Sequence, residues 1–193
     1  WVPDQYHASA ESMAHIAGMI QAGWDVVVTH GNGPQVGFIL RRSELSKHEL
    51  HEVPLDYCGA DTQGAIGYMI QKALLNEFRK RGISKKVTTV VTQTIVERDD
   101  PSFKHPSKPI GSFMSEKEAL SNKEEFGWEV LEDAGRGFRR VVPSPIPREI
   151  IELDIVRLLV ERGYIVVATG GGGIPVIRNE RQDLEGVEAV IDK

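Results

Sequence analysis

Two kinds of hydrophobic pattern follow one another along the chain. In the longer stretches apolar residues recur every three or four positions, which is typical of amphipathic helices. This pattern predicts helices over the ranges 8–23, 34–47, 56–81 and 147–162. Short runs rich in β-branched residues lie between them and predict strands over 24–29, 87–96, 139–142 and 164–168.

The patterns also predict which residues are buried. The runs Val26–Val28 and Ile165–Val167 are continuously apolar, so we expect both strands to be buried on both faces. Gly23, Gly82 and Gly163 stand where helices should stop. In the helix over 147–162, the side expected to face the core comprises Ile150, Ile151, Leu153, Val156, Leu158 and Leu159.

Residues 97–140 interrupt this alternation. They contain several prolines and glycines around a short acidic helix, which we expect to begin near Ser115. We therefore predict a protruding insertion or lid over 97–140, called the insertion below. The other elements predict an α/β fold, a three-layer α/β/α sandwich with a mainly parallel sheet. In such sheets ligands bind beyond the carboxyl ends of the strands.

A glycine-rich loop follows two of the predicted strands. One is His30-Gly31-Asn32-Gly33 and the other runs from Thr169 to Gly173, so we expect both at the same edge of the sheet. Glycine lets backbone N–H groups approach an anion, and a helix starting at Pro34 adds its positive end. The Asn32 amide can both donate and accept. The alternative is a pair of tight β–α turns, since neither loop matches a P-loop or a complete dinucleotide fingerprint.

Composition and charge narrow the function classes. The formal net charge of −5 lacks the basic excess of nucleic-acid-binding proteins. No apolar run approaches the roughly 20 residues that cross a bilayer, and no signal peptide is visible. Cys58 is the single cysteine, and the histidines show no metal-ligand spacing. We therefore expect a cytoplasmic protein that binds neither nucleic acid nor membrane and has no metal site of its own.

Five groups of residues resemble motifs of the amino acid kinase superfamily, and of the carbamate kinases in particular. They cover nearly the whole chain in the family's order: 30–37, 54–68, 108–113 (Lys-Pro-Ile-Gly-Ser-Phe), 132–137 with 139–145, and 171–176 with 186–193. The resemblance implies the carbamate kinase-like fold with a lid. It also implies reversible phosphoryl transfer between ATP and carbamate, giving ADP and carbamoyl phosphate. In the family this reaction often runs toward ATP in arginine catabolism.

The resemblance further implies roles for individual residues. Lys108 would swing over the bound anion, and Lys193 would lie against the transferring phosphoryl group. Asp192 would orient that lysine, or merely start a helix. Mg²⁺ would accompany ATP or ADP by bridging the phosphates. The residues implied to bind carbamate or carbamoyl phosphate are Gly31, Asn32 and Gly33, together with the backbone N–H groups of Gly171, Gly172 and Gly173.

The chain departs from the family pattern in several places. Nothing corresponds to the family's opening strand with its Gly-Gly-Asn phosphate loop, or to its nucleotide-binding half. We therefore expect residues 1–193 to be the substrate-binding, N-terminal part of the kinase domain, truncated at both ends and inactive alone. Ser112 replaces a usual proline in the lid motif. Asp61 puts a charge on a helix face that we expect to be partly buried.

Several alternatives remain open. The chain could belong to another phosphotransferase of the superfamily, or be a non-catalytic module that binds carbamoyl phosphate. His30 could touch a ligand, and Cys58 fits a packed helix residue better than a nucleophile. A homodimer is implied by the family and finds some support in Ile66, Tyr68 and Met69 on the long helix. The insertion also contains three arginines, Arg136, Arg139 and Arg140. We expect them to pair with Glu132 or Asp133 rather than to contact substrate.

Overall fold

The structure is a computed structural model that describes residues 2–191, and the side chains from residue 6 onward. Its helices are α1 (Val2–Gln21), α2 (Gln35–Ser46), α3 (Leu55–Arg81), α4 (Glu116–Phe126) and α5 (Leu153–Glu161), with 3₁₀ turns η1 (Pro101–Phe103) and η2 (Gly170–Gly172). Its strands are β1 (Val27–Val28), β2 (Val87–Thr89), β3 (Gln93–Val96), β4 (Lys108–Met114), β5 (Val130–Glu132), β6 (Phe138–Val142), β7 (Pro147–Ile150), β8 (Ile165–Val167), β9 (Ile174–Arg178) and β10 (Leu184–Gly186).

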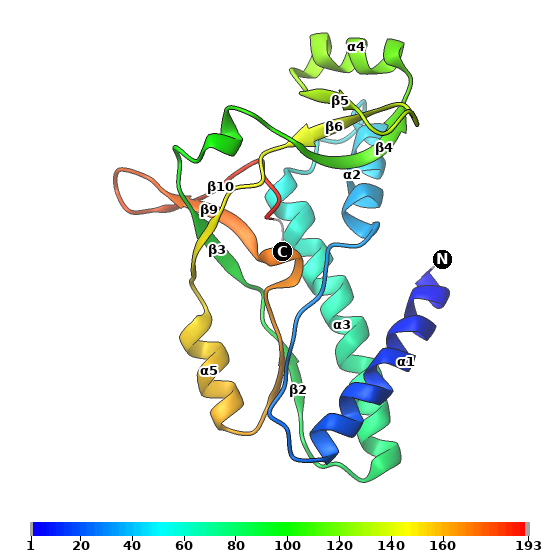
Figure 1. Cartoon of the computed structure of the whole chain (residues 1–193), viewed down its shortest axis with the longest axis vertical. Helices are drawn as coiled ribbons and strands as arrows, with labels where there is room; N and C mark the ends of the chain where they lie inside the picture. Colours follow the sequence, from blue (N-terminus) through cyan, green and yellow to red (C-terminus); the bar gives the residue numbers. More distant parts are fainter. Residues whose placement is uncertain (1, 192–193) are drawn as a thin grey trace.

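A parallel sheet in the order β1-β8-β2 lies between two layers of helices (Figure 1). Successive residues of β8 point to opposite faces. Ile165 and Val167 join the core formed with α1 and α3, whereas Val166 packs with Val156 of α5. This arrangement confirms the predicted α/β class, with helices on both faces of a parallel sheet.

The predicted strand over 87–96 is wrong as a single element. β2 belongs to the parallel sheet, whereas β3 belongs to a second sheet of order β10-β9-β3-β7. The chain leaves the first sheet between them, where the side chain of Gln63 from α3 bonds to both the N–H and the C=O of Thr92. A polar side chain from a distant helix therefore divides a run that looks continuous in sequence.

The predicted helix over 147–162 is also wrong in its first part. Pro147–Ile150 form β7, which pairs antiparallel with β3, and the helix begins only at Leu153. Glu152 accepts hydrogen bonds from the backbone and side chain of Gln93, which ties this corner to β3. Leu153 and Leu158 were expected in the core but are 37% and 52% exposed. Only the side of α5 that carries Val156, Leu159 and Val160 packs against the sheet, so Leu153 and Leu158 stay outside this contact.

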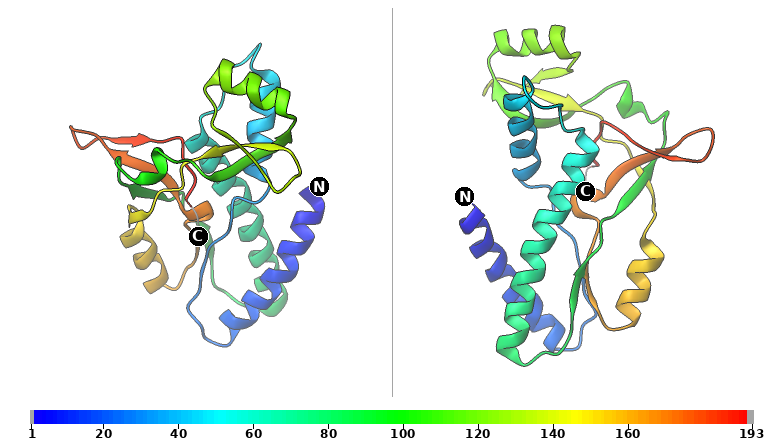
Figure 2. Two further views of the ribbon diagram at one scale, coloured as in Figure 1. Left: turned by 45° about the horizontal axis from the view of Figure 1, so that its top comes forward. Right: turned by 180° about the vertical axis from the view of Figure 1, so that it is seen from behind.

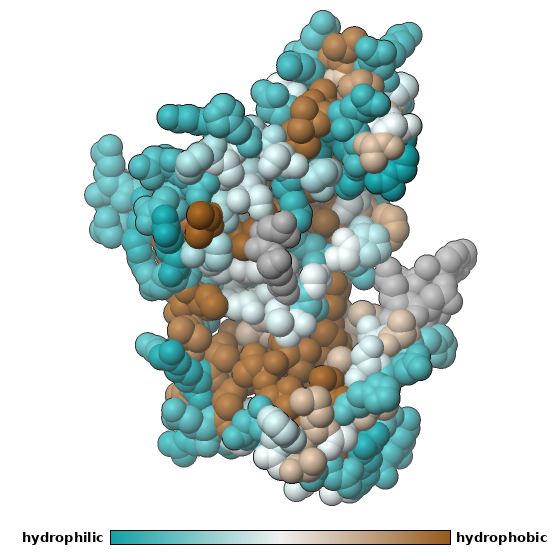
Figure 3. All heavy atoms as spheres, in the orientation of Figure 1, coloured by the Kyte–Doolittle hydropathy of each residue, from teal (hydrophilic) through white to brown (hydrophobic). Residues whose placement is uncertain are grey.

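β1 was expected to be buried on both faces, but only one of its two faces is buried. Val28 is buried in the core with α1 and α3, whereas Val27 on the opposite face is 47% exposed. β1 pairs with β8 and stands at the edge of its sheet. Figure 3 shows an apolar area on this side, between α5 and α1.

The insertion contains its own antiparallel sheet, in the order β4-β6-β5, with α4 packed against it at one end of the molecule (Figures 1 and 2). Ser115 caps α4, and Glu118 returns the bond to the Ser115 N–H, which forms a capping box. The helix therefore begins where the sequence predicts. Whether this part moves as a lid stays a prediction.

The long helix α3 runs along the outside of the molecule and ends at Gly82, which adopts a left-handed conformation as predicted. Asp61 is exposed on this helix, so the expectation of a partly buried charge there is wrong. Within the described residues, no helix is long and apolar enough to cross a membrane.

Candidate active site

The two glycine-rich loops meet at one edge of the parallel sheet, as predicted. Val28 of β1 is in register with Val167 of β8, and both strands end in the same direction. Beyond them, the N–H of Gly171 donates to the carbonyl of His30 over 2.8 Å. The hydroxyl of Thr29 donates to the carbonyl of Thr169 over 3.2 Å. The loops are therefore joined to each other as well as to their strands.

A cavity of about 480 Å³ opens in front of these loops. It lies between the first loop, the start of α2 and the β4 strand of the insertion. The cavity is lined by Gly31, Asn32, Gly33, Pro34, Val36, Gly37, Phe38, Lys108, Pro109, Ile110, Gly111, Ser112, Arg139, Gly171, Val190 and Ile191. Of the residues with predicted roles at the site, the cavity brings together Gly31, Asn32 and Gly33 of the first loop with Lys108 and Gly171.

The second loop does not present its N–H groups to the cavity in the expected way. Gly171 donates to His30, Gly172 to Thr169 and Gly173 to Gly170. The first bond joins the two loops and the other two close the η2 turn, and Gly172 and Gly173 do not line the cavity. In this arrangement all three N–H groups are already engaged, so anion binding by three successive N–H groups of this loop stays a prediction.

Gly171 instead makes room for Asn32. Its φ of +66° is left-handed, and a Cβ atom there would lie 2.0 Å from the Asn32 Oδ1 atom. Only glycine permits this close approach. Within the described residues, Oδ1 of Asn32 is buried without a hydrogen-bond partner. An unsatisfied buried acceptor is costly, so the Asn32 side chain would gain free energy by taking up a polar partner.

A buried network from three other elements holds the second loop. Gln63, which is 1% exposed, donates to the carbonyls of Thr92 and Gly170 and accepts the Thr92 N–H. Thr94 donates to the carbonyl of Gly172 over 2.9 Å. Thr169 has a φ of +50°, which is unusual for a β-branched residue and persists only where the surroundings fix it. The pattern of apolar residues could not reveal the role of Gln63.

Two cationic side chains from the insertion line the cavity. Lys108 begins β4, and its position in register with Val142 fixes it at the base of the insertion sheet. Arg139 of β6 donates to the carbonyl of Gly111 over 3.2 Å and to Asp133 over 3.1 Å. Together with the positive end of α2, these charges make the cavity suitable for a small anion.

The arginines of the insertion pair with carboxylates, and one of them also lines the cavity. Arg136 and Arg139 pair with Asp133, and the hydrogen bond from Arg139 is the main reason that the pKa of Asp133 lies below its usual range. Arg139 also lines the cavity. Arg140, the next residue of β6, pairs with Glu188 instead of the expected carboxylates. Pairing within the insertion therefore does not exclude a place at the site.

The ring of His30 packs under the second loop. A Cβ atom on Gly170 would lie 2.4 Å from the His30 Cε1 atom, so the glycine allows the ring to come close. The His30 Nδ1 atom lies 2.8 Å from the carbonyl of Gly31. These contacts give His30 a part in shaping both loops. Contact with a ligand stays a prediction.

Cys58 is fully buried on α3, and burial raises the pKa of its thiol to about 11. At pH 8 roughly one thiol in a thousand is then ionised. We expect iodoacetamide to leave Cys58 unmodified in the folded protein and to alkylate it fully in urea. Mass spectrometry of the peptide that contains Cys58 measures both. Rapid alkylation of the folded protein would contradict the burial.

Two residues with predicted catalytic roles, Asp192 and Lys193, lie outside the described residues. The segment that leads to them is described as far as Ile191, and both Val190 and Ile191 line the cavity. The N–H of Val190 donates to the carbonyl of Pro143 over 3.0 Å, which holds this segment against the end of the insertion.

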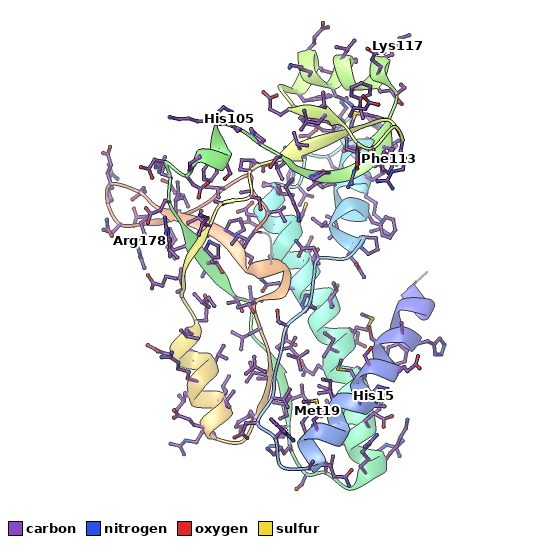
Figure 4. The ribbon with its side chains drawn as sticks, in the orientation of Figure 1. His15, Met19, His105, Phe113, Lys117 and Arg178 are labelled. Carbon is purple, nitrogen blue, oxygen red and sulfur yellow. The ribbon has the colours of Figure 1, made fainter. Side chains whose placement is uncertain are left out.

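The described residues contain no cluster of three or more histidine, cysteine, aspartate or glutamate side chains that could hold a metal ion. His15 on α1 and His105 near η1 lie far apart (Figure 4). No carboxylate lies in the described lining of the cavity. A Mg²⁺ ion would therefore depend on phosphate oxygens, or on residues beyond those described.

No family model matches the chain. Comparison with individual known proteins nevertheless finds several carbamate kinases that are similar to it. The chain is 57% identical over 180 residues to the carbamate kinase of Pyrococcus horikoshii, covering 92% of this chain and 57% of that protein. It is 52% identical over 187 residues to the carbamate kinase of Thermococcus kodakarensis, covering 96% of this chain and 58% of that protein. The chain therefore spans less than two thirds of the length of these relatives.

Solved structures share the fold. A protein from Aeropyrum pernix K1 superposes with a TM-score of 0.95 at 40% identity, over 100% of this chain and 62% of that one. The carbamate kinase of Giardia lamblia bound to AMP-PNP superposes with a TM-score of 0.90 at 41% identity, over 98% of this chain and 60% of that one. Sequence and fold thus agree over nearly all of the described chain.

Proposed function

We propose that this chain, which is homologous to the carbamate kinases, forms the carbamate side of an enzyme that transfers a phosphoryl group between ATP and carbamate. The cavity carries the proposal, because it sets Asn32 and Gly31 opposite two cations from the insertion, Lys108 and Arg139. The cytoplasmic location and the role in arginine catabolism that the resemblance implies belong to the same proposal.

The geometry suits both ends of carbamoyl phosphate. Asn32 lines the cavity, and its amide group can accept an N–H from the carbamoyl amide. Lys108 and Arg139 can neutralise the anionic end, where charge is spread over the transferring group. The apolar lining from Val36, Ile110 and Ile191 lowers the local dielectric constant, which strengthens the attraction between these cations and an anion. Carbamate brings an ionised oxygen nucleophile, so a general base is not required.

Mg²⁺ is part of the proposal as a companion of the nucleotide. It would be held mainly by the phosphates of ATP or ADP, since no carboxylate lies in the described lining of the cavity. Its charge would be added to those of Lys108 and Arg139 around the transferring group. Lys193 and Asp192 complete the proposed set as residues that follow the cavity-lining segment.

The activity is tested with the full-length protein, ADP, Mg²⁺ and carbamoyl phosphate. We expect ATP to form in proportion to the carbamoyl phosphate consumed, as measured by luciferase luminescence. The reverse assay supplies ATP with carbamate, glutamate or a nucleoside monophosphate. A preference for one of the latter two acceptors would point to another kinase of the superfamily. Tight binding of carbamoyl phosphate by calorimetry, without any turnover, would favour a non-catalytic module.

We also propose that two copies associate through the outer face of α3. Tyr57, Tyr68 and Leu75 lie on this face and are 64%, 63% and 41% exposed. Figure 2 shows α3 along the outside of the molecule in the view from behind. Ile66, which the sequence offered for this contact, is buried in the core and is not available. Large exposed apolar and aromatic residues on one helix face are typical of an interface.

Replacing Leu75 by glutamate is expected to shift the full-length protein from dimer to monomer, because a buried charge opposes association. Sedimentation velocity measures the change. Leu120→Glu is the matched control, since Leu120 is 56% exposed on α4, away from this face. A Leu75→Glu protein that sediments as the unaltered protein does would exclude this face.

A further inference from the structure

Glu188 lies where three parts of the molecule meet. Its Oε1 atom accepts the backbone N–H of Leu55, the first residue of α3, over 2.8 Å. Its Oε2 atom accepts from the Arg140 guanidinium on β6 of the insertion over 3.1 Å. Glu188 itself belongs to the segment whose next residues, Val190 and Ile191, line the cavity. One carboxylate therefore joins α3, the insertion and the wall of the site.

The contact with α3 replaces a local cap. The residue before the helix is Pro54, whose side chain makes no capping bond, and Leu55 is only 2% exposed. A buried N–H at a helix start needs a partner, and a carboxylate also interacts favourably with the helix dipole. Glu188 supplies both the hydrogen-bond acceptor and the negative charge, from a position that is distant in sequence.

The contact with the insertion is made by a side chain that is itself held in place. Arg140 is 19% exposed, and its guanidinium stacks over the ring of Trp128 at 4.9 Å. Successive residues of a strand point to opposite faces. Arg139 accordingly lines the cavity while Arg140 reaches Glu188 on the other side of the insertion sheet. Both arginines belong to β6, so the strand contacts the cavity on one face and Glu188 on the other.

The segment after Glu188 is packed against the site. Ala189 and Ile191 are buried, and the N–H of Val190 donates to Pro143 directly after β6. A Cβ atom on Gly172 would lie 2.7 Å from the Ile191 Cγ2 atom, so this segment also touches the second glycine-rich loop. A shift of β6 would therefore displace both Val190 and Glu188, because hydrogen bonds join them to β6 and to the residue that follows it.

We propose that Glu188 is a positioning residue that couples the insertion to the cavity wall by binding Arg140 and the start of α3 at once. It touches no reacting atom. Its role is to keep Lys108 and Arg139, on the insertion, in register with the loops on the parallel sheet. This inference rests on the proposed function for its kinetic test, and on the contacts alone for its structural test.

The kinetic test uses Glu188→Gln, Arg140→Gln and the double variant of the full-length protein. Each single change is expected to lower kcat for ATP formation roughly three- to tenfold, with the KM for ADP altered less than about twofold. The double variant should be no slower than the slower single variant, because both changes break one link. Additive losses, or Glu188→Gln kinetics equal to those of the unaltered protein, would overturn the proposal.

Glu185→Gln is the matched control. Glu185 pairs with Arg98 over 3.2 Å on the surface, three residues before Glu188, and lies outside the cavity lining. We expect its kinetics to be unchanged. Glutamine at 188 keeps an oxygen for the Leu55 N–H, so α3 stays capped and the variant should fold, which thermal unfolding checks.

Hydrogen exchange gives a result that does not depend on turnover. Peptides that cover β6 and residues 187–191 should exchange faster in Glu188→Gln than in Glu185→Gln, because the link between them is lost. If the unaltered protein forms no ATP, the proposed function fails. This comparison still shows whether Glu188 couples β6 to residues 187–191. Equal exchange in the two variants would overturn this coupling.

Discussion

Lys108→Ala is expected to lower kcat for ATP formation by the full-length protein by roughly 10²- to 10³-fold. The lysine lines the cavity opposite the first glycine-rich loop and supplies positive charge where the phosphoryl group transfers. A methyl group supplies no charge, and Arg139 is already engaged by Asp133 and Gly111. Initial-rate kinetics with carbamoyl phosphate and ADP measure the loss.

Lys104→Ala is the matched control for this change. Lys104 lies four residues before Lys108, in the same part of the chain, and its side chain is exposed outside the cavity lining. Its removal should leave kcat within about twofold, as expected of a solvated surface lysine. Equal effects of the two substitutions would show that the Lys108 charge has no particular place in the reaction.

The second large effect is expected from Gln63→Leu, which should lower the free energy of unfolding by about 2–4 kcal/mol. Leucine nearly fills the same volume but makes none of the three hydrogen bonds of Gln63. The carbonyls of Thr92 and Gly170 keep a second partner each, in Ile174 and Gly173. The buried Thr92 N–H loses the side-chain acceptor that Gln63 supplies, so it carries most of the cost.

Urea denaturation of the full-length protein measures this loss, and Gln71→Leu is its control. Gln71 lies two turns further along α3 and accepts one bond, from the Thr89 hydroxyl, at a partly buried position. We expect Gln71→Leu to cost less than about 1 kcal/mol. Activity should also fall in Gln63→Leu, because Gln63 holds the second loop beside Asn32. A Gln63→Leu protein as stable as the Gln71→Leu protein would contradict the network.

Much of the fold follows from local pattern. The helix that begins at Leu55 ends at Gly82 because glycine readily adopts the left-handed cap, and α4 begins at Ser115 because serine and Glu118 complete a capping box. Ile165–Val167 form a buried strand, as expected for a continuous β-branched run. Such signals act over a few residues, so they survive in most tertiary contexts.

The secondary structure predicted from local pattern was wrong where contacts with residues distant in sequence determined the fold. The run over 87–96 has uniform strand character, yet it divides at Thr92, where Gln63 inserts from α3. Ile150 continues the helical spacing of Leu153 and Val156, yet Pro147–Ile150 pair with β3. Local propensity is worth a few tenths of a kcal/mol per residue, and pairing with an existing strand outweighs it.

The site divides in the same way. The order of motifs along the chain was enough to predict the family. It also singled out Gly31, Asn32, Gly33 and Lys108, which the structure brings to one cavity, since these motifs depend on residue types at short spacing. Only the tertiary structure showed that the N–H groups of the second loop bond to its own turn and to His30, and that Gly171 makes room for Asn32. It also showed that Glu188 joins Arg140 to α3. These contacts join residues far apart in sequence, and the packing of the whole fold determines which of them meet.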